Sequence, residues 1–158
     1  MTDKEFLTRE ESEKAIKFWK NQFKEIYKVS TGLDFDSNLR YEGTLDFIIY
    51  EIFKIKDDKK LAAHFLYEVA RKHPFVDGNK RTALLIALVV LSQTVMKGKK
   101  DFFTKIFEGF MKPYRGKEKE MDRNDMNLVK FMKDVAAGKK TYDEVLEFID
   151  KHIIYRLE

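Results

Sequence analysis

Nine consecutive residues, His73 to Arg81, bring together side chains that could do chemistry: His-Pro-Phe-Val-Asp-Gly-Asn-Lys-Arg. His73 supplies an imidazole, the side chain that most often serves as a general base. Asp77 supplies carboxylate oxygens, which are hard ligands suited to Mg²⁺. Lys80 and Arg81 supply two positive charges for an anion. A base, a metal ligand and an anion-binding group are the parts that transfer a phosphorus-centred group to a hydroxyl.

The expected position of Lys80 and Arg81 supports this interpretation. They begin a long apolar segment that predicts a helix, although the helix macrodipole favours negative charge at that end. The unpaired backbone N–H groups there attract phosphate, and Gly78 lets the backbone come close to it. A bound polyanion would therefore satisfy the N–H groups and the two cations together.

Each of these residues alone has an ordinary structural explanation. A histidine at a helix end is more often a partner of the helix dipole than a catalyst. An Asp-Gly pair is a common turn, and a Lys-Arg pair is usually solvated surface. Their occurrence together, within nine residues and between two apolar helical segments, is what indicates a site.

Two helices are expected to position this segment. An Asp-Asp pair at 57–58 predicts the start of a helix over about 59–72. Pro74 disfavours helical geometry at His73, so that helix should end there. The next helix is expected over about 78–96. Because it is apolar nearly all round, we expect it to be the central buried helix.

The rest of the chain is also predicted to be helical, as a single all-α domain of six to eight helices over residues 1–158. Capping boxes at residues 8–11 and 141–144 open the first and last helices. Residues 45–55 favour a helix but leave a strand open, residues 102–111 favour a helix, and residues 114–120 read as a charged loop. Apolar residues at 126, 129, 132 and 135 predict a helix that Gly138 closes.

Composition excludes several classes of protein. The chain of 158 residues has no cysteine, which excludes disulfides and thiolate metal sites. Its longest apolar run, residues 83–91, is too short to span a bilayer. A net charge of +4 from interspersed basic and acidic residues indicates a solvated surface without a nucleic-acid-binding face. The charged N-terminus lacks a signal region, so we expect a cytoplasmic protein that does not contact a membrane.

The segment His-Pro-Phe-Val-Asp-Gly-Asn-Lys-Arg resembles the motif of the Fic/Doc family, and all seven specified positions agree. The resemblance is clearest over residues 35–97, followed by a helical C-terminal extension at 112–158. It implies a transferase that uses ATP and Mg²⁺ to modify other proteins. The implied roles are a base (His73), a metal ligand (Asp77), a loop anchor (Phe75), an anion hole (Gly78, Asn79, Lys80) and a phosphate ligand (Arg81).

A second segment looks like the flap with which such proteins position their target. It comprises Arg40, Tyr41, Glu42 and Gly43 with their neighbours from Asn38 to Leu45. If the likeness extends to its conformation, this flap would be a short β-hairpin in the otherwise all-α domain.

Two positions distinguish the branches of the family. Most adenylyltransferases of this family have glycine where this chain has Lys80, and a second arginine where it has Leu84. The sequence thus resembles the Doc toxin branch. This resemblance implies transfer of the ATP γ-phosphate to a Ser or Thr hydroxyl of a target protein, which would be elongation factor Tu. Such a toxin would require an antitoxin from a separate chain. The alternatives are AMP transfer to Ser, Thr or Tyr, and a binding module without catalysis.

The pattern of a known inhibitory helix also occurs once. Thr104, Glu108 and Gly109 fit Ser/Thr-x-x-x-Glu-Gly, with Thr104 and Glu108 on one helix face. In the family this glutamate pairs with the second arginine, and Leu84 replaces that arginine here.

Overall fold

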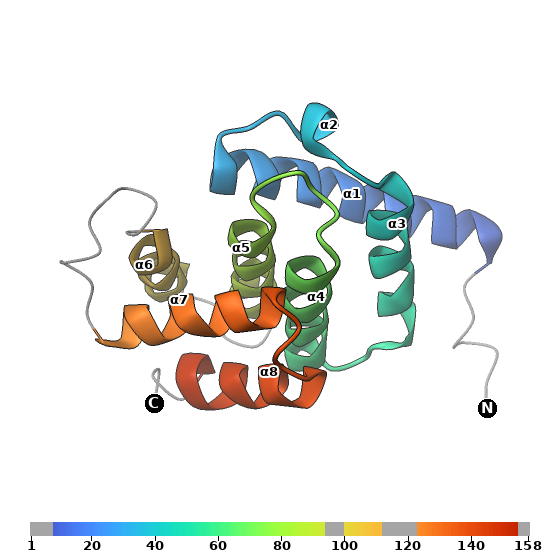
Figure 1. The fold of residues 1–158 in the computed structure, drawn as a ribbon. Helices are drawn as coiled ribbons and strands as arrows, with labels where there is room; N and C mark the ends of the chain where they lie inside the picture. Colours follow the sequence, from blue (N-terminus) through green and yellow to red (C-terminus); the bar gives the residue numbers. More distant parts are fainter. Residues whose placement is uncertain (1–7, 94–99, 112–122, 155–158) are drawn as a thin grey trace.

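A computed structural model describes residues 8–93, 100–111 and 123–154 of the chain (Figure 1). Within these residues the chain forms eight α-helices and no strand, which confirms the predicted all-α class. The α-helices are α1 (Arg9–Thr31), α2 (Phe35–Asn38), α3 (Glu42–Tyr50), α4 (Asp58–Lys72), α5 (Asn79–Gln93), α6 (Lys100–Met111), α7 (Arg123–Ala136) and α8 (Tyr142–Phe148). A 3-10 turn, Glu51–Lys54, follows α3, and a π-helical turn, Ile149–Ile154, follows α8.

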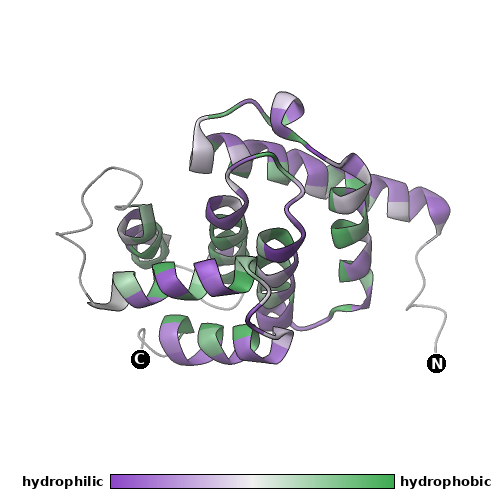
Figure 2. Cartoon of the chain, in the orientation of Figure 1, coloured by the Kyte–Doolittle hydropathy of each residue, from purple (hydrophilic) through white to green (hydrophobic). Residues whose placement is uncertain are grey.

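Helices α4 and α5 form the centre of the fold, and the segment with the candidate site joins them (Figure 1). The side chain of Asp57 accepts hydrogen bonds from the backbone N–H groups of residues 59 and 60, which starts α4. α5 begins at Asn79, and the green apolar residues around its axis in Figure 2 agree with the predicted buried helix. The end of α5 is described only to Gln93, so the last residues of the predicted helix lie outside the described part.

Helix α1 packs across α5 and beside the joining segment. The capping box predicted at its start is present, with Thr8 and Glu11 bonded reciprocally through side chain and backbone. Gly32 ends the helix in the left-handed conformation, with φ of 71°. The face that carries Phe23, Ile26 and Tyr27 is buried, so this long helix supplies one wall of the core.

Residues 42–54 are helical, which resolves the choice between helix and strand in favour of the helix. The β-hairpin that the flap likeness suggested does not form among the described residues. Instead a single antiparallel bridge joins Leu39 to Phe75. A lone hairpin is marginal in water, and here the capped turn of α2 and the start of α3 leave only a few extended residues between them.

The C-terminal helices α6, α7 and α8 cover the other side of the α4–α5 pair (Figure 1). The second predicted capping box, Thr141 with Glu144, opens α8, and Gly138 follows α7 with φ of 77°. Met126 is exposed, although it continues the apolar spacing of α7, whose later residues Met132 and Val135 are fully buried. The predicted charged loop at 114–120 lies outside the described residues. No described helix is both long and apolar enough to cross a bilayer.

Candidate active site

His73 lies at the end of α4 in a conformation that is rare for any residue other than glycine. Its φ of 51° and ψ of 60° place it in the left-handed region, and among the described non-glycine residues no other has a positive φ. Pro74 disfavours the helical region for the residue before it, which accounts for the end of α4 at this position. The turn directs the half-buried imidazole toward α7, where Nε2 lies 3.3 Å from the carbonyl oxygen of Ala136.

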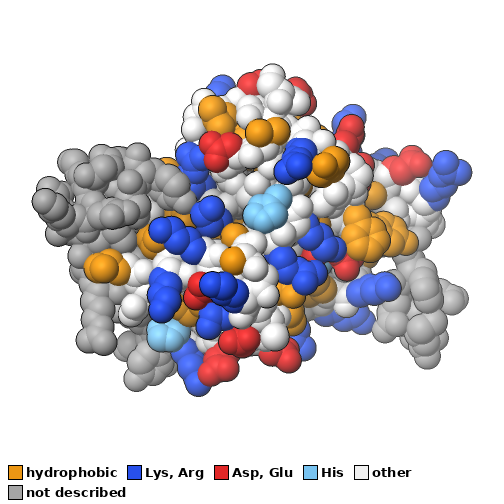
Figure 3. All heavy atoms as spheres, in the orientation of Figure 1, with side chains coloured by type: hydrophobic (Ala, Val, Ile, Leu, Met, Phe, Trp, Pro, Cys, Tyr) orange, Lys and Arg blue, Asp and Glu red, His pale blue; other side chains and the backbone are white. Residues whose placement is uncertain are grey.

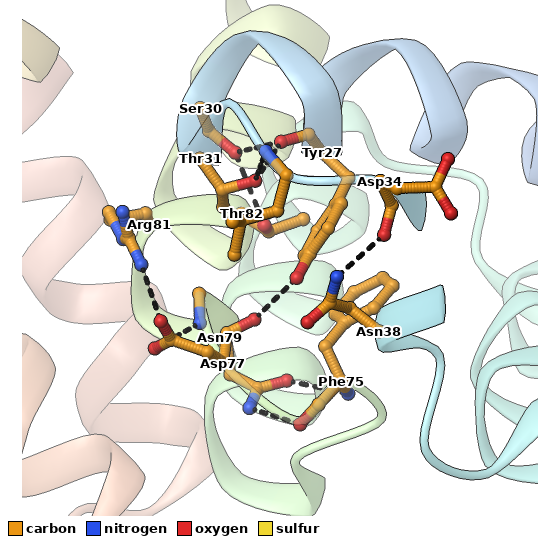
Figure 4. Close-up of polar contacts among 12 residues, drawn as sticks. Tyr27, Ser30, Thr31, Asp34, Asn38, Phe75, Asp77, Asn79, Arg81 and Thr82 are labelled. Carbon is orange, nitrogen blue, oxygen red and sulfur yellow. Dashed lines mark hydrogen bonds and ion pairs between the residues drawn. The ribbon is translucent and has the colours of Figure 1, made fainter. Parts of the chain in front are cut away.

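Phe75 fixes the joining segment to the core. Its side chain is fully buried, and its ring stacks on that of Tyr27 with centroids 4.3 Å apart. Phe35 contacts both rings edge-on. The Tyr27 hydroxyl donates to the carbonyl oxygen of Asp77 at 2.8 Å, so α1 holds both halves of the segment (Figure 4).

The Asn79 side chain closes the loop between α4 and α5. Its Oδ1 accepts from the N–H of Phe75 at 2.9 Å, and its Nδ2 donates to the carbonyl oxygen of Phe75 at 2.8 Å (Figure 4). The residue is buried. The amide is therefore engaged by the loop itself, and the contribution to an anion hole that the sequence predicts for Asn79 would come from its backbone N–H.

Gly78 is required by both its backbone conformation and its surroundings. Its φ is 82°, and a Cβ built on it would overlap the methyl group of Thr31. Thr31 is fixed in turn, because its hydroxyl donates to the carbonyl oxygen of Tyr27 at 2.6 Å. The close approach of α1 to this glycine shapes the turn that leads into α5.

Asp77 and Arg81 pair with each other in this structure. Oδ1 of Asp77 accepts from the Gly78 N–H at 2.7 Å, and Oδ2 lies 3.3 Å from Nη2 of Arg81. The Asp77 side chain is 68% exposed and that of Arg81 only 14%. Arg81 is thus held in place beside the turn, while the carboxylate stays open to solvent and to a cation.

The start of α5 is electropositive. Its first turn contains Lys80 and Arg81 and no acidic residue, so these cations add to the positive end of the helix dipole. Lys80 is half-buried and makes no ion pair with another described residue. Figure 3 shows Lys and Arg side chains gathered around a histidine in the middle of the face that it presents. This arrangement favours a polyanionic ligand.

The donor set at the turn fits Mg²⁺ carried by a nucleotide. No group of three or more potential ligand side chains occurs among the described residues, which is not the pattern of an all-protein metal cage. Mg²⁺ is commonly held by one or two carboxylates together with substrate phosphates and water. Asp77 offers one exposed carboxylate beside the electropositive start of α5, which is the protein part of such a site.

The flap segment lies directly against the joining segment. The backbone N–H groups of Arg40 and Tyr41 donate to the carbonyl oxygen of Pro74 at 2.8 and 3.3 Å. The Val76 N–H donates to the carbonyl oxygen of Asn38 at 2.8 Å. These bonds set the flap beside His73, with the exposed Arg40 guanidinium over the Tyr41 ring.

The other two flap residues lie at the start of α3. Glu42 forms an ion pair with Lys20 of α1 at 2.6 Å, and the hydrogen bond from Lys20 lowers the pKa of the Glu42 carboxyl. Gly43 has open space around its Cα. Glu42 is thereby tied to α1, whereas Arg40 and Tyr41 face solvent.

The residues of the inhibitory pattern lie on α6, which packs against α5 and α7. Thr104 lines a cavity of about 690 Å³ together with Ser92 and Gln93 from the last turn of α5. Glu108 is exposed and Gly109 is buried. Leu84, where the resemblance would place a second arginine, is fully buried in the core. The inhibitory role of this pattern stays a prediction.

Three contributors to the site could not be identified from the sequence. Tyr27 lies on the buried face of α1, where an aromatic side chain indicates only core. Thr31 is the last residue of α1, and its type gave no signal. Ala136 contributes a backbone carbonyl, which carries no residue-type signal. Tyr27 and Ala136 contact residues that are 50 and 63 positions away in the sequence. Only positions that vary together among related sequences could have pointed to such contacts.

Comparison with known protein families gives one match to this chain. Residues 19–91, just under half of the chain, match the Fic/DOC family. This part of the chain is therefore similar to a family whose members are generally transferases of AMP or of phosphoryl groups. The match begins before residue 35, where the sequence likeness was expected to start, and it includes the part of α1 that holds the loop. No curated protein and no solved structure is significantly similar to the chain.

Proposed function

We propose that this protein is a Fic-type transferase of the Doc kind, which moves the γ-phosphate of ATP to a Ser or Thr hydroxyl of a target protein. The family match over residues 19–91 supports transfer chemistry in general. The choice of phosphoryl transfer depends chiefly on one observation. The first turn of α5 presents Lys80 where an adenylyltransferase of this family would have glycine.

The chain's own residues divide the work as follows. His73 takes the proton of the target hydroxyl while the hydroxyl oxygen bonds to the γ-phosphorus. The bond from that phosphorus to the ADP oxygen breaks. Asp77 would hold the Mg²⁺, which neutralises charge on the phosphates. Lys80, Arg81 and the first N–H groups of α5 bind phosphate oxygens. Arg81 would exchange its contact with Asp77 for one with phosphate.

Leu84 supports the same branch. A second arginine at this position would hold the outer phosphates in the orientation for AMP transfer. Here the side chain is fully buried in the core, where an unpaired charge would be costly. In this proposal Lys80 takes the space that a glycine would leave for the α-phosphate, and the γ-phosphate would then lie next to His73.

AMP transfer is the second candidate, because His73, Asp77 and Arg81 would serve both reactions. A binding module without catalysis is a third, and the retention of all the reactive side chains in one turn argues against it. In the Doc-like interpretation the protein would act in the cytoplasm. Its target, as the resemblance to the Doc branch implies, would be elongation factor Tu. It would block translation until an antitoxin chain binds it.

Labelled ATP distinguishes these candidates. The protein is incubated with Mg²⁺, a cell lysate and ATP labelled at either the α- or the γ-phosphorus. We expect protein-bound label from γ-labelled ATP alone. Label from the α position alone would establish AMP transfer and refute phosphoryl transfer. Absence of label from both, in protein that binds ATP and Mg²⁺, would favour the binding module.

Lys80→Gly should weaken γ-label transfer by roughly ten- to a hundredfold, because one charge-assisted contact worth about 1.5–3 kcal/mol is removed. It should also open space for some α-label transfer. Lys60→Gly is the matched control, since Lys60 lies in the first turn of α4 and is exposed. Both changes place glycine in a helix, at a cost of about 1 kcal/mol. Equal γ-label rates in the two variants would refute the role of Lys80.

A further inference from the structure

The imidazole of His73 is held by a part of the chain that lies outside the family match. Its Nε2 contacts the carbonyl oxygen of Ala136, the last residue of α7, at 3.3 Å. The family match ends at residue 91, and Ala136 lies beyond it, 63 positions after His73 in the sequence. The C-terminal extension thus returns to the candidate active site and touches its base.

The way in which α7 ends leaves this carbonyl available. The last carbonyls of a helix have no partner within the helix. Here the N–H groups of Ala137, Gly138 and Lys139 donate to the carbonyl oxygens of residues 133, 135 and 134 at 2.9 to 3.0 Å. These bonds close the helix over three carbonyls and leave that of Ala136 to the imidazole.

The carbonyl is also fixed in position relative to α4. Met132 and Val135, in the last turns of α7, are fully buried, and α7 packs against α4, α5 and α6. Gly138 takes a left-handed φ of 77° and ends the helix at this point. His73 is constrained from its own side by its left-handed backbone before Pro74. Both partners of the contact are therefore held by the backbone, not by flexible side chains.

A carbonyl oxygen only accepts hydrogen bonds, so its partner nitrogen must carry a hydrogen. A neutral imidazole has one N–H and one nitrogen with a free lone pair. We propose that the Ala136 carbonyl is a positioning group that holds neutral His73 as the Nε2–H tautomer, so that Nδ1 takes the proton of the target hydroxyl. The role of His73 as a base rests on the proposed function, whereas its tautomer does not.

The proposal gives the C-terminal extension a task in the reaction. The negative end of the α7 dipole faces the N–H of the base, and the tautomer would be set before substrate arrives. Orientation of a catalytic histidine through the hydrogen bond of its other nitrogen is a general device in such sites.

Esters in the backbone of α7 can test the contact without changing a side chain. Ala137→lactic acid converts the amide after Ala136 to an ester, whose carbonyl oxygen is a weaker acceptor, and it removes the Ala137 N–H. Gly138→glycolic acid is the matched control, since it also removes one backbone N–H but weakens the Ala137 carbonyl instead. Each is introduced into the full chain, and the three histidines are labelled with ¹⁵N for NMR.

Spectra recorded at a pH where imidazole is neutral should show His73 as the Nε2–H tautomer in the unmodified protein. The ester at residue 137 should produce a mixture of tautomers, and the ester at 138 should not. His64, whose Nε2 lies 2.9 Å from the carbonyl oxygen of Ile48, should stay Nε2–H in all three proteins and serves as the reference. A hydrogen on Nδ1 of His73, or equal spectra for the two esters, would overturn the proposal.

The transfer assay separates this proposal from the function itself. The ester at 137 should lower kcat for label transfer by roughly two- to tenfold, the range expected for one weakened hydrogen bond. KM for ATP should not change, because the Ala136 carbonyl contacts His73 and not the residues proposed to bind phosphate. If the unmodified protein transfers no label, the proposed function fails, and the NMR spectra still decide the tautomer.

Discussion

His73→Asn is expected to lower the rate of γ-label transfer by roughly 10²- to 10⁴-fold, because a positioned general base contributes about that much. Asparagine tolerates the left-handed backbone that this position requires, and it cannot accept the hydroxyl proton. The loss of the contact with Ala136 should cost only about 1 kcal/mol of unfolding free energy. The measurement is single-turnover label transfer, with growth inhibition on expression as a second readout.

His152→Asn is the control, because His152 is exposed and stacks on Phe148 in the last helical turn. It should transfer label at the rate of the unmodified protein. Transfer by the His73 variant within a few-fold of that rate would show that the imidazole is not the base. The assignment of Asp77 and Lys80 as ligands would survive that result, since they act on the phosphates.

Gly78→Ala is expected to lower the free energy of unfolding by about 2–4 kcal/mol. The left-handed φ of 82° costs an L-residue about 1–2 kcal/mol. The overlap of the new Cβ with the Thr31 methyl group adds a similar amount through overpacking. Denaturant unfolding measures the loss, and the turn into α5 should shift enough to impair transfer as well.

Gly32→Ala separates the two contributions. Gly32 has a similar φ of 71°, but a Cβ there would meet nothing within 4 Å, so only the backbone term of about 1 kcal/mol should appear. In a Thr31→Ser background, which removes the methyl group and keeps the hydroxyl, Gly78→Ala should cost less. Equal losses for the two glycine variants, or no coupling in this double-mutant cycle, would show that α1 does not constrain the turn.

Several helix boundaries followed from local signals in the sequence. Both capping boxes, the Asp57 cap and the end of α4 before Pro74 are where the residue types placed them. Each depends on side chains within a few positions of the backbone groups that they satisfy. Local signals did not indicate that Met126 is exposed or that the suggested hairpin is absent. Exposure on α7 and strand pairing depend on neighbours far along the chain.

The sequence by itself determined which side chains make up the candidate site, because they lie in one nine-residue segment between two apolar helices. Only the tertiary structure decided how they are held. Tyr27 and Thr31 of α1 shape the turn, and the Ala136 carbonyl contacts the base. Such contacts join backbone groups and core residues from distant helices, so no local pattern of residue types encodes them.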